Sequence, residues 1–102
     1  MKFTSQIQDQ TGIVKLEGRF TFETHPEFKS CTQNMLENKG LKELVLDMEG
    51  VHDMDASSLG MILLLRENTE ERGLRLTLKR PSQPVRRLLE RVQFEKIFPI
   101  QS

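Results

Sequence analysis

A chain of 102 residues is long enough for one hydrophobic core, so we expect a single domain over residues 1–102. Its 15 basic and 15 acidic residues balance, which argues against nucleic acid or an anionic membrane as the main partner. One cysteine cannot form an internal disulfide, the N-terminus lacks the apolar run of a secretory signal, and the longest apolar run, residues 61–65, cannot span or insert into a bilayer. We therefore expect a cytoplasmic protein.

The chain opens with a pattern typical of a β-hairpin. Apolar and polar residues alternate over residues 3–7, and the turn-like segment Asp9–Gly12 follows. Residues 13–18 read as a second short strand. Two such strands around a short turn predict an antiparallel pair.

A helix is predicted next. Thr24 has a residue type favoured at an N-cap, Pro26 suits the first turn, and Glu27 would complete a capping box. Apolar residues then recur at helical spacing as far as Leu36. The pair Lys39–Gly40 is typical of a helix C-terminus.

The middle of the chain predicts a buried strand followed by a second helix. Residues 41–48 are rich in Leu and Val, as in a strand that is buried on both faces. Glu49–Gly50 is expected to end this strand, and residues 52–55 are expected to form a loop. Residues 57–72 contain strong helix formers, and Gly73 is expected to end that helix.

The C-terminal third predicts one more strand, one more helix and a tail. Residues 74–79 alternate cleanly, which predicts a half-buried strand with three leucines facing inward: Leu74, Leu76 and Leu78. Ser82 is expected to cap a third helix that has Pro84 in its first turn. The apolar tail from Phe94 to Ile100 could pack back as a short strand or clasp.

The predicted order is ββαβαβα plus a C-terminal tail, which indicates a small α/β domain. Alternation of strands and helices implies parallel crossovers, so the sheet should be mixed, with helices packed on it. In such sheets, sites form beyond the carboxyl ends of the strands. Residues 54–61 (MDASSLGM) and 19–25 (RFTFETH) are both expected there.

Catalytic and metal sites find little support in the residue pattern. The acidic and histidine side chains around the third strand fit neither an EF-hand nor a zinc motif; they are Asp47, Glu49, His52, Asp53 and Asp55. No G-x-S-x-G elbow surrounds the serines, and the available histidines, His25 and His52, read as surface-loop residues. Cys31 lies on the apolar stripe of the first helix and reads as a small buried residue. We expect no catalytic residue, no metal and no cofactor, and hence a binding module.

Two adjacent serines, Ser57 and Ser58, stand where the buried strand gives way to the second helix. One interpretation is that Ser57 caps the helix, a contribution of about 1 kcal/mol. The other is that its hydroxyl accepts a chemical group. Both can hold at once, because a capping hydroxyl at a surface turn is still open to a kinase.

The segment LVLDMEGVHDMDASSLGMILLL, residues 44–65, resembles the STAS family, which includes bacterial anti-sigma factor antagonists. The family pattern is an apolar strand ending in Asp, a GV turn, and D-S-S/T-G-L-G at the start of a helix. The matching residues are Asp47, Gly50, Val51, Asp55, Ser57, Leu59 and Gly60. The chain departs from the pattern at Ala56, where the family often has Ser, and at Ser58, where it often has Gly. The hairpin, the LEGRF strand exit and the IFPI end extend the resemblance over most of the chain.

The resemblance implies a partner-switching regulator that is not an enzyme. Unphosphorylated, it would bind an anti-sigma factor with serine kinase activity; phosphorylation on Ser57, with Ser58 as the second choice, would release it. ATP would be bound by the kinase, and a PP2C-type phosphatase would reset the switch. The implied partner surface consists of Arg19, Phe20, Thr21, Phe22, Met54, Asp55, Ala56, Ser58, Leu59, Gly60 and Met61.

Two other functions are compatible with the same resemblance and residues. A STAS protein can be an accessory subunit of a lipid-transport ABC complex, and the Ser57 hydroxyl would then need no phosphate. An esterase-like hydrolase acting through Ser57 is the enzyme alternative.

A phosphate on Ser57 would sit at a helix N-terminus, where the dipole favours negative charge, so we expect the fold to tolerate it.

Overall fold

The computed structural model describes residues 1–93 and 99–101. Its elements, in chain order, are β1 (Lys2–Gln8), β2 (Thr11–Phe20), the 3-10 helix η1 (Phe22–Thr24), α1 (His25–Leu36), β3 (Glu43–Met54), α2 (Ala56–Glu71), β4 (Arg75–Lys79), α3 (Gln83–Arg91) and β5 (Ile100–Gln101). The predicted order of strands and helices is confirmed.

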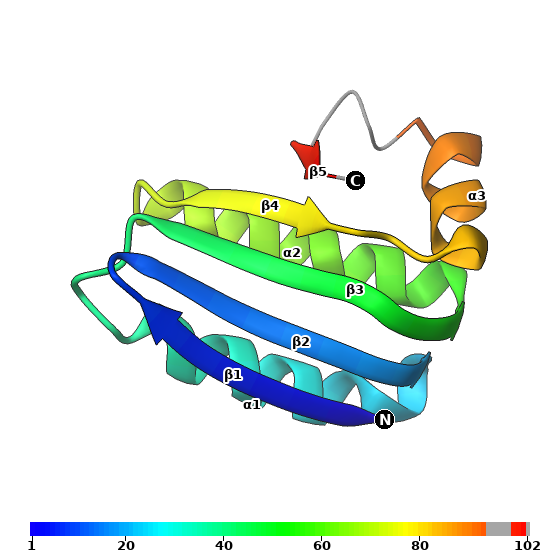
Figure 1. Cartoon of the computed structure of the whole chain (residues 1–102), viewed down its shortest axis with the longest axis horizontal. Helices are drawn as coiled ribbons and strands as arrows, with labels where there is room; N and C mark the ends of the chain where they lie inside the picture. Colours follow the sequence, from blue (N-terminus) through cyan, green and yellow to red (C-terminus); the bar gives the residue numbers. More distant parts are fainter. Residues whose placement is uncertain (94–98, 102) are drawn as a thin grey trace.

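The five strands form one mixed sheet in the order β1-β2-β3-β4-β5 (Figure 1). The β1–β2 pair is antiparallel, as the hairpin pattern predicts, and the other three pairs are parallel. Parallel neighbours need crossover connections, which α1 supplies between β2 and β3 and α2 supplies between β3 and β4. The predicted α/β class with a mixed sheet is therefore confirmed.

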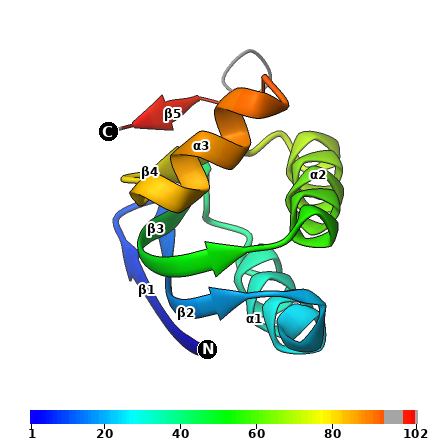
Figure 2. The ribbon, with the colours of Figure 1, turned by 90° about the vertical axis from the view of Figure 1, so that its right-hand side faces the viewer.

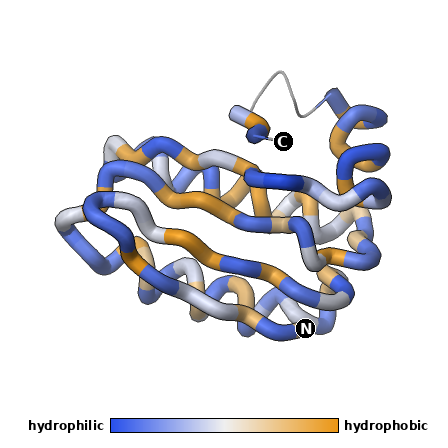
Figure 3. Tube along the Cα trace, viewed as in Figure 1, coloured by the Kyte–Doolittle hydropathy of each residue, from blue (hydrophilic) through white to orange (hydrophobic). Residues whose placement is uncertain are grey.

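Helices α1 and α2 lie side by side on one face of the sheet (Figure 2). Helix α1 packs against β1 and β2, α2 packs against β4, and α3 contacts β3. Apolar residues run along the middle strands, whereas the turns are mostly hydrophilic (Figure 3). The largest fully buried side chains are Phe20, Phe28, Leu16, Leu44, Leu46, Met48, Ile62, Leu78, Leu89, Val14, Val51 and Val85.

Strand β3 is longer than the sequence pattern predicts. All of residues 44–48 are buried, as expected, but the strand continues through Glu49–Gly50 to Met54. The predicted break at Glu49–Gly50 and the predicted loop over residues 52–55 are therefore wrong, apart from Asp55. Pairing with β2 overrides the local preference, and register shifts between the two strands absorb the extra residues of β3.

Gly50 is the residue that this irregular pairing needs. A Cβ at this position would lie 2.9 Å from Glu17 Cγ and 3.2 Å from the carbonyl oxygen of Leu16 on the neighbouring strand. The GV pair of the sequence motif thus marks the point where strands β2 and β3 approach closely within a bulge.

The helix starts differ in detail from the predicted caps. Thr24 is the N-cap of α1, but its hydroxyl donates to the carbonyl of Thr21 at 2.8 Å and the predicted capping box is absent. Ser82 precedes α3 as predicted, and its hydroxyl donates to the carbonyl of Val51 instead of capping the helix. Both hydroxyls therefore anchor the chain before the helix to other backbone groups.

Strand β4 is buried more completely than its alternation suggests. Leu76 and Leu78 are buried and Leu74 is partly buried, but Thr77 on the opposite face is buried as well. Its hydroxyl donates to the Glu43 carboxylate at 2.7 Å, which satisfies the polar group. Of the predicted tail, residues 94–98 lie outside the described residues, and Ile100 pairs with Leu78 in β5. Within the described part of the chain, no helix is long and apolar enough to cross a membrane.

Candidate functional site

The two segments that were expected beyond the strand ends meet there. The last paired residues of β2 and β3 are Phe20 and Met54, and the amide of Asp55 donates to the carbonyl of Phe20 at 3.2 Å. The turn formed by η1 and the start of α2 therefore lie beside one another at the carboxyl ends of these strands. This end of the molecule faces the viewer in Figure 2.

The N-cap of α2 is Asp55, and the prediction that Ser57 caps the helix is wrong. The Asp55 Oδ1 atom accepts a hydrogen bond from the backbone amide of Ser58 at 2.9 Å, which is the capping interaction. The same oxygen lies 2.8 Å from the hydroxyls of Ser57 and of Ser58. The other oxygen, Oδ2, accepts from the backbone amide of Phe22 at 3.0 Å.

These hydrogen bonds change the acidity of Asp55. Desolvation raises its pKa, but hydrogen bonds from the side chains of Ser58 and Ser57 and from the backbone amides of Ser58 and Phe22 outweigh it. Their combined effect lowers the pKa of Asp55 from its ordinary 3.8 to about 2. The carboxylate is therefore fully ionised at neutral pH and acts as an acceptor at both oxygens.

The two serines occupy opposite environments although they are adjacent. Ser57 is exposed in the first turn of α2, and its hydroxyl donates to Asp55 at 2.8 Å. Ser58 is 0% exposed, and its Oγ lies 2.9 Å from the carbonyl oxygen of Phe20. Only the Ser57 hydroxyl is thus open to an external reagent in this conformation.

His25 belongs to the same network, which the sequence reading as a surface-loop residue missed. It is the first residue of α1, and its Nε2 lies 2.9 Å from Ser58 Oγ. The Ser58 hydroxyl has one proton, and the Phe20 carbonyl and the Asp55 carboxylate both compete to accept it. We therefore assign the proton of the contact with Ser58 to His25 Nε2.

This arrangement differs from a hydrolase triad. In a triad the carboxylate contacts the histidine and the histidine accepts the serine proton, whereas here Asp55 contacts Ser58 directly. The histidine contact goes to the buried Ser58 and not to the exposed Ser57, which is the residue that an esterase reading requires. Among the described residues, the partner of the Ser57 hydroxyl is the Asp55 carboxylate and not a histidine.

The predicted partner surface is divided by burial. Four of its side chains are buried and support the surface from below: Phe20, Met54, Ser58 and Leu59. Thr21, Asp55 and Met61 are partly buried. The exposed members are Arg19, Phe22, Ala56 and Gly60. Ala56 and Gly60 lie beside Ser57 in α2, whereas Arg19 and Phe22 come from the end of β2 and from η1.

Phe22 is the most exposed large apolar side chain described, at 66%. It forms part of the rim of a hollow of about 350 Å³, which is lined by Met1, Arg19, Thr21, Phe22, Glu23, Thr24 and Asp55. Aromatic residues, Phe among them, are enriched in protein–protein interfaces, so this exposed ring is a candidate contact for a partner.

Leu64 on α2 is also exposed, at 55%, and the sequence reading did not single it out. The signal was present, because five consecutive apolar residues, 61–65, cannot all face the core from one helix. Leu64 follows Ser57 by seven positions, so the two share a helix face.

The acidic residues that were weighed as metal ligands are engaged in other contacts. Asp47 is buried and forms an ion pair with Arg80, which also pairs with Glu49 at 3.5 Å. Asp53 pairs with Arg19 at 3.4 Å, and both side chains are exposed. Among the described residues, no three His, Cys, Asp or Glu side chains gather as a metal site would require.

Cys31 is partly buried on α1, and burial raises the pKa of its thiol. A raised thiol pKa lowers the fraction of reactive thiolate at neutral pH. The expectation of a buried residue is thus met in part: Cys31 packs against the core but is only partly buried.

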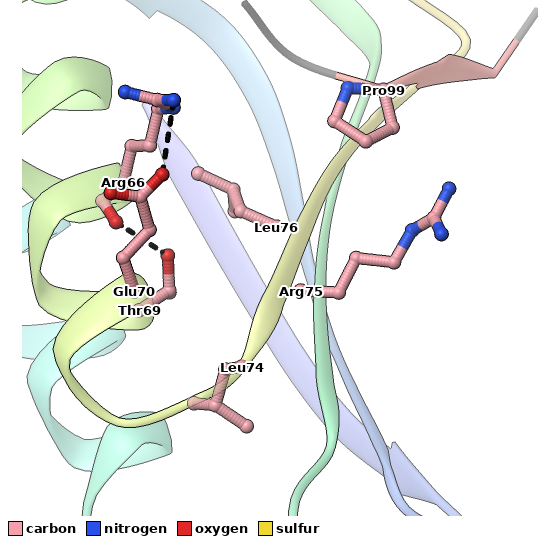
Figure 4. Close-up of a pocket in the computed structure, with 7 residues that line it drawn as sticks. All are labelled: Arg66, Thr69, Glu70, Leu74, Arg75, Leu76 and Pro99. Carbon is pink, nitrogen blue, oxygen red and sulfur yellow. Dashed lines mark hydrogen bonds and ion pairs between the residues drawn. The ribbon is translucent and has the colours of Figure 1, made fainter.

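A further hollow lies at the other end of α2, against β4 (Figure 4). It measures about 180 Å³ and is lined by Arg66, Thr69, Glu70, Leu74, Arg75, Leu76 and Pro99. Glu70 pairs with Arg66 at 3.0 Å, and the Thr69 hydroxyl donates to the Arg66 carbonyl at 2.8 Å. This volume is below the roughly 300–1,000 Å³ typical of small-molecule sites, so this hollow is not taken as the candidate site.

A mixed sheet with two helices on one face, and a polar network at the start of the second helix, defines a small α/β domain. The family model of the STAS domain matches residues 2–102, and the chain belongs to that family. A STAS-domain containing protein of Pseudomonas aeruginosa (strain UCBPP-PA14) is 30% identical over 87 residues, which cover 85% of this chain and 84% of the relative.

Solved structures share the fold. A crystal structure from Thermotoga maritima, of a protein provisionally assigned as an anti-sigma factor antagonist, has a TM-score of 0.88 at 25% identity and covers 98% of this chain and 86% of that chain. The unphosphorylated form of the anti-sigma factor antagonist SpoIIAA has a TM-score of 0.76 at 18% identity, with 99% and 88% covered. A sulfate transporter family protein of Wolinella succinogenes has a TM-score of 0.77 at 21% identity, with 94% and 80% covered.

Proposed function

We propose that this protein is an anti-sigma factor antagonist that works by partner switching and is not itself an enzyme. The observation that carries the proposal is the exposed hydroxyl of Ser57 in the first turn of α2, next to a serine that is fully buried. The likeness to anti-sigma factor antagonists supports it, including SpoIIAA, which has been solved in unphosphorylated and phosphorylated forms.

The chemical step takes place on Ser57 and is performed by the partner. The Ser57 oxygen attacks the γ-phosphoryl group of ATP bound to the kinase, the hydroxyl loses its proton, and ADP leaves. A PP2C-type phosphatase would return the serine to its free form by hydrolysis. This chain supplies only the acceptor oxygen.

The phosphate would change the charge of the surface and leave the fold in place. Its roughly −1.5 to −2 charges would lie at a helix N-terminus, where the helix dipole favours them. The same charges would lie close to Asp55 and to Asp53, two acidic residues that come just before Ser57 on the chain. A partner that contacts this surface with apolar or acidic groups would be repelled, and a difference of about 3 kcal/mol is enough for roughly a hundredfold loss of affinity.

The contact surface would be built from the exposed residues around Ser57. Phe22 supplies an apolar anchor, Arg19 a cation, and Gly60 a position where α2 has no side chain. The buried members of the predicted surface would act by supporting these residues.

The decisive experiment combines this protein with a candidate anti-sigma factor kinase and ATP, followed by mass spectrometry of the intact chain and its peptides. We expect one phosphate, on Ser57, and none on a Ser57→Ala variant. Ser58→Ala is the matched control and should still accept the phosphate. Phosphate that remains on the Ser57→Ala variant would remove this residue from the mechanism.

A transport-associated role is the second candidate, and the shared fold with a sulfate transporter family protein is compatible with it. As an accessory subunit of a lipid-transport ABC complex, the domain would hold an ATPase subunit permanently. Co-purification with an ATPase that is unaffected by Ser57→Asp would favour this function over partner switching.

A further inference from the structure

We infer that Asp55 is a positioning residue that couples the phosphorylation of Ser57 to the position of the turn at residues 21–24, called here the Phe22 turn. The inference rests on the proposed function, because its input is a phosphate on Ser57. It adds a second means of release, in which the phosphate also withdraws an apolar anchor from the partner.

The coupling is visible in the two oxygens of one carboxylate. Oδ1 of Asp55 accepts from the Ser57 hydroxyl at 2.8 Å, and Oδ2 accepts from the backbone amide of Phe22 at 3.0 Å. The two oxygens belong to one planar group, so neither can move alone. Ser57 on α2 and the backbone amide of Phe22 are therefore held by a single side chain, that of Asp55, which lies 33 positions after Phe22.

Phosphorylation breaks this arrangement at Oδ1. The ester oxygen of phosphoserine carries no proton, so the hydrogen bond from Ser57 to Asp55 is lost. A dianion is placed next to a carboxylate that is fully ionised at neutral pH, and the two repel. When the carboxylate turns away from the phosphate, Oδ2 leaves the Phe22 amide.

The Phe22 turn has few other attachments in the described structure. The Phe22 ring is 66% exposed, so core packing does not hold it in place. Within η1, the Thr24 amide and hydroxyl both bond to the Thr21 carbonyl at 2.9 Å and 2.8 Å, which ties the turn to itself. The Asp55 bond to the Phe22 amide is what ties it to α2.

The capping bond from the Ser58 amide to Asp55 gives the test its control. Asparagine is also a good N-cap, so Asp55→Asn keeps an acceptor for Ser58 but lacks a second acceptor for the Phe22 amide. This variant should release the Phe22 turn without melting the start of α2.

The experiment uses two-dimensional NMR of the full chain with phosphoserine incorporated at position 57 during synthesis, so it needs neither kinase nor partner. We expect the Phe22 amide resonance to move and its hydrogen exchange to accelerate at least severalfold, and the Ser58 amide, which donates to Oδ1 of the same carboxylate, to shift as well. Ser57→Ala removes the hydrogen bond without adding charge and should leave Phe22 close to its wild-type position. In Asp55→Asn, Phe22 should be displaced already, and phosphoserine should add no further change.

An unchanged Phe22 amide in the phosphoserine protein would overturn the inference. So would an equal displacement by phosphoserine with and without Asp55. If Asp55→Asn does not fold, the comparison of phosphoserine with Ser57→Ala still decides. The proposed function fails separately, through the absence of kinase-dependent phosphate on Ser57.

Discussion

The Nε2 atom of His25 lies 2.9 Å from the Oγ atom of Ser58, and this contact joins the first turn of α1 to the first turn of α2. Both helices lie on one face of the sheet and begin at the same end (Figures 1 and 2). The polar contact between them therefore fixes the relative position of the two helix starts, which carry the exposed residues of the candidate site.

Replacing Ser58 by alanine should destabilise the protein, whereas replacing Ser57 should not. Ser58→Ala removes the buried hydroxyl that contacts His25 and the Phe20 carbonyl, at a cost of about 1–3 kcal/mol. Ser57→Ala removes one exposed hydrogen bond and should stay within about 0.5 kcal/mol of wild type. Urea unfolding of both variants measures the difference, and equal effects would contradict the contrast in burial.

The free energy of unfolding should depend on Asp55 at acidic pH. The folded-state pKa of about 2 lies below the ordinary 3.8, so the ionised carboxylate stabilises the fold above that ordinary value. Its contribution is lost progressively as the pH falls from 3.8 toward 2. Over this window, the stability advantage of wild type over Asp55→Asn should shrink, as measured by urea unfolding at a series of pH values. An advantage that grows on acidification would show that the sign is wrong.

Gly60→Ala should stabilise the isolated protein and weaken its binding to the partner. Gly60 lies inside α2, and an added Cβ would meet nothing within 4 Å. Alanine in a helix interior is favoured over glycine by roughly 0.5–1 kcal/mol. The methyl group would nevertheless stand on the proposed contact surface, one turn from Ser57.

Gly50→Ala is the matched control for this substitution. Its added Cβ would lie 3.2 Å from the carbonyl oxygen of Leu16, a backbone atom of the neighbouring strand, so this change should destabilise the fold. Thermal unfolding and calorimetric titration with the anti-sigma factor test both variants. A Gly60→Ala protein that is more stable and binds as well as wild type would show that the partner does not approach α2 at this point.

Most of the fold was predictable because the apolar pattern of each element agrees with its final position. The alternation of strands and helices predicts the parallel pairs, and these bring Phe20 and Met54 to the same edge. The length of β3 was not predictable from local preference, because Glu49–Gly50 is a poor strand segment that only pairing with β2 keeps extended.

The candidate site was predictable in part. The N-cap role of Asp55 could have been found, because an aspartate three residues before Ser58 is a favoured capping pattern. The contact of His25 with Ser58 could not, because the residues are 33 positions apart and meet only through the packing of α1 beside α2 on the sheet.

Phe22→Ala should reduce partner binding and leave the fold unchanged. The Phe22 ring is 66% exposed, so its removal costs little core packing, and the amide that Asp55 holds belongs to the backbone and stays in place. If Phe22 is a hot spot of the interface, its truncation costs about 2 kcal/mol or more, which corresponds to roughly a thirtyfold loss of affinity or greater. Calorimetric titration with the unphosphorylated protein measures this loss.

Ile7→Ala provides the control for the Phe22 substitution. Ile7 is also an exposed large apolar residue, at 48%, but it pairs with Gly12 beside the hairpin turn, at the opposite end of β2 from Phe22. Its truncation should leave the affinity for the partner within about twofold, since it lies outside the proposed contact surface. Because both changes remove exposed apolar area, equal losses of affinity would show that binding follows general surface hydrophobicity and not the turn next to Ser57.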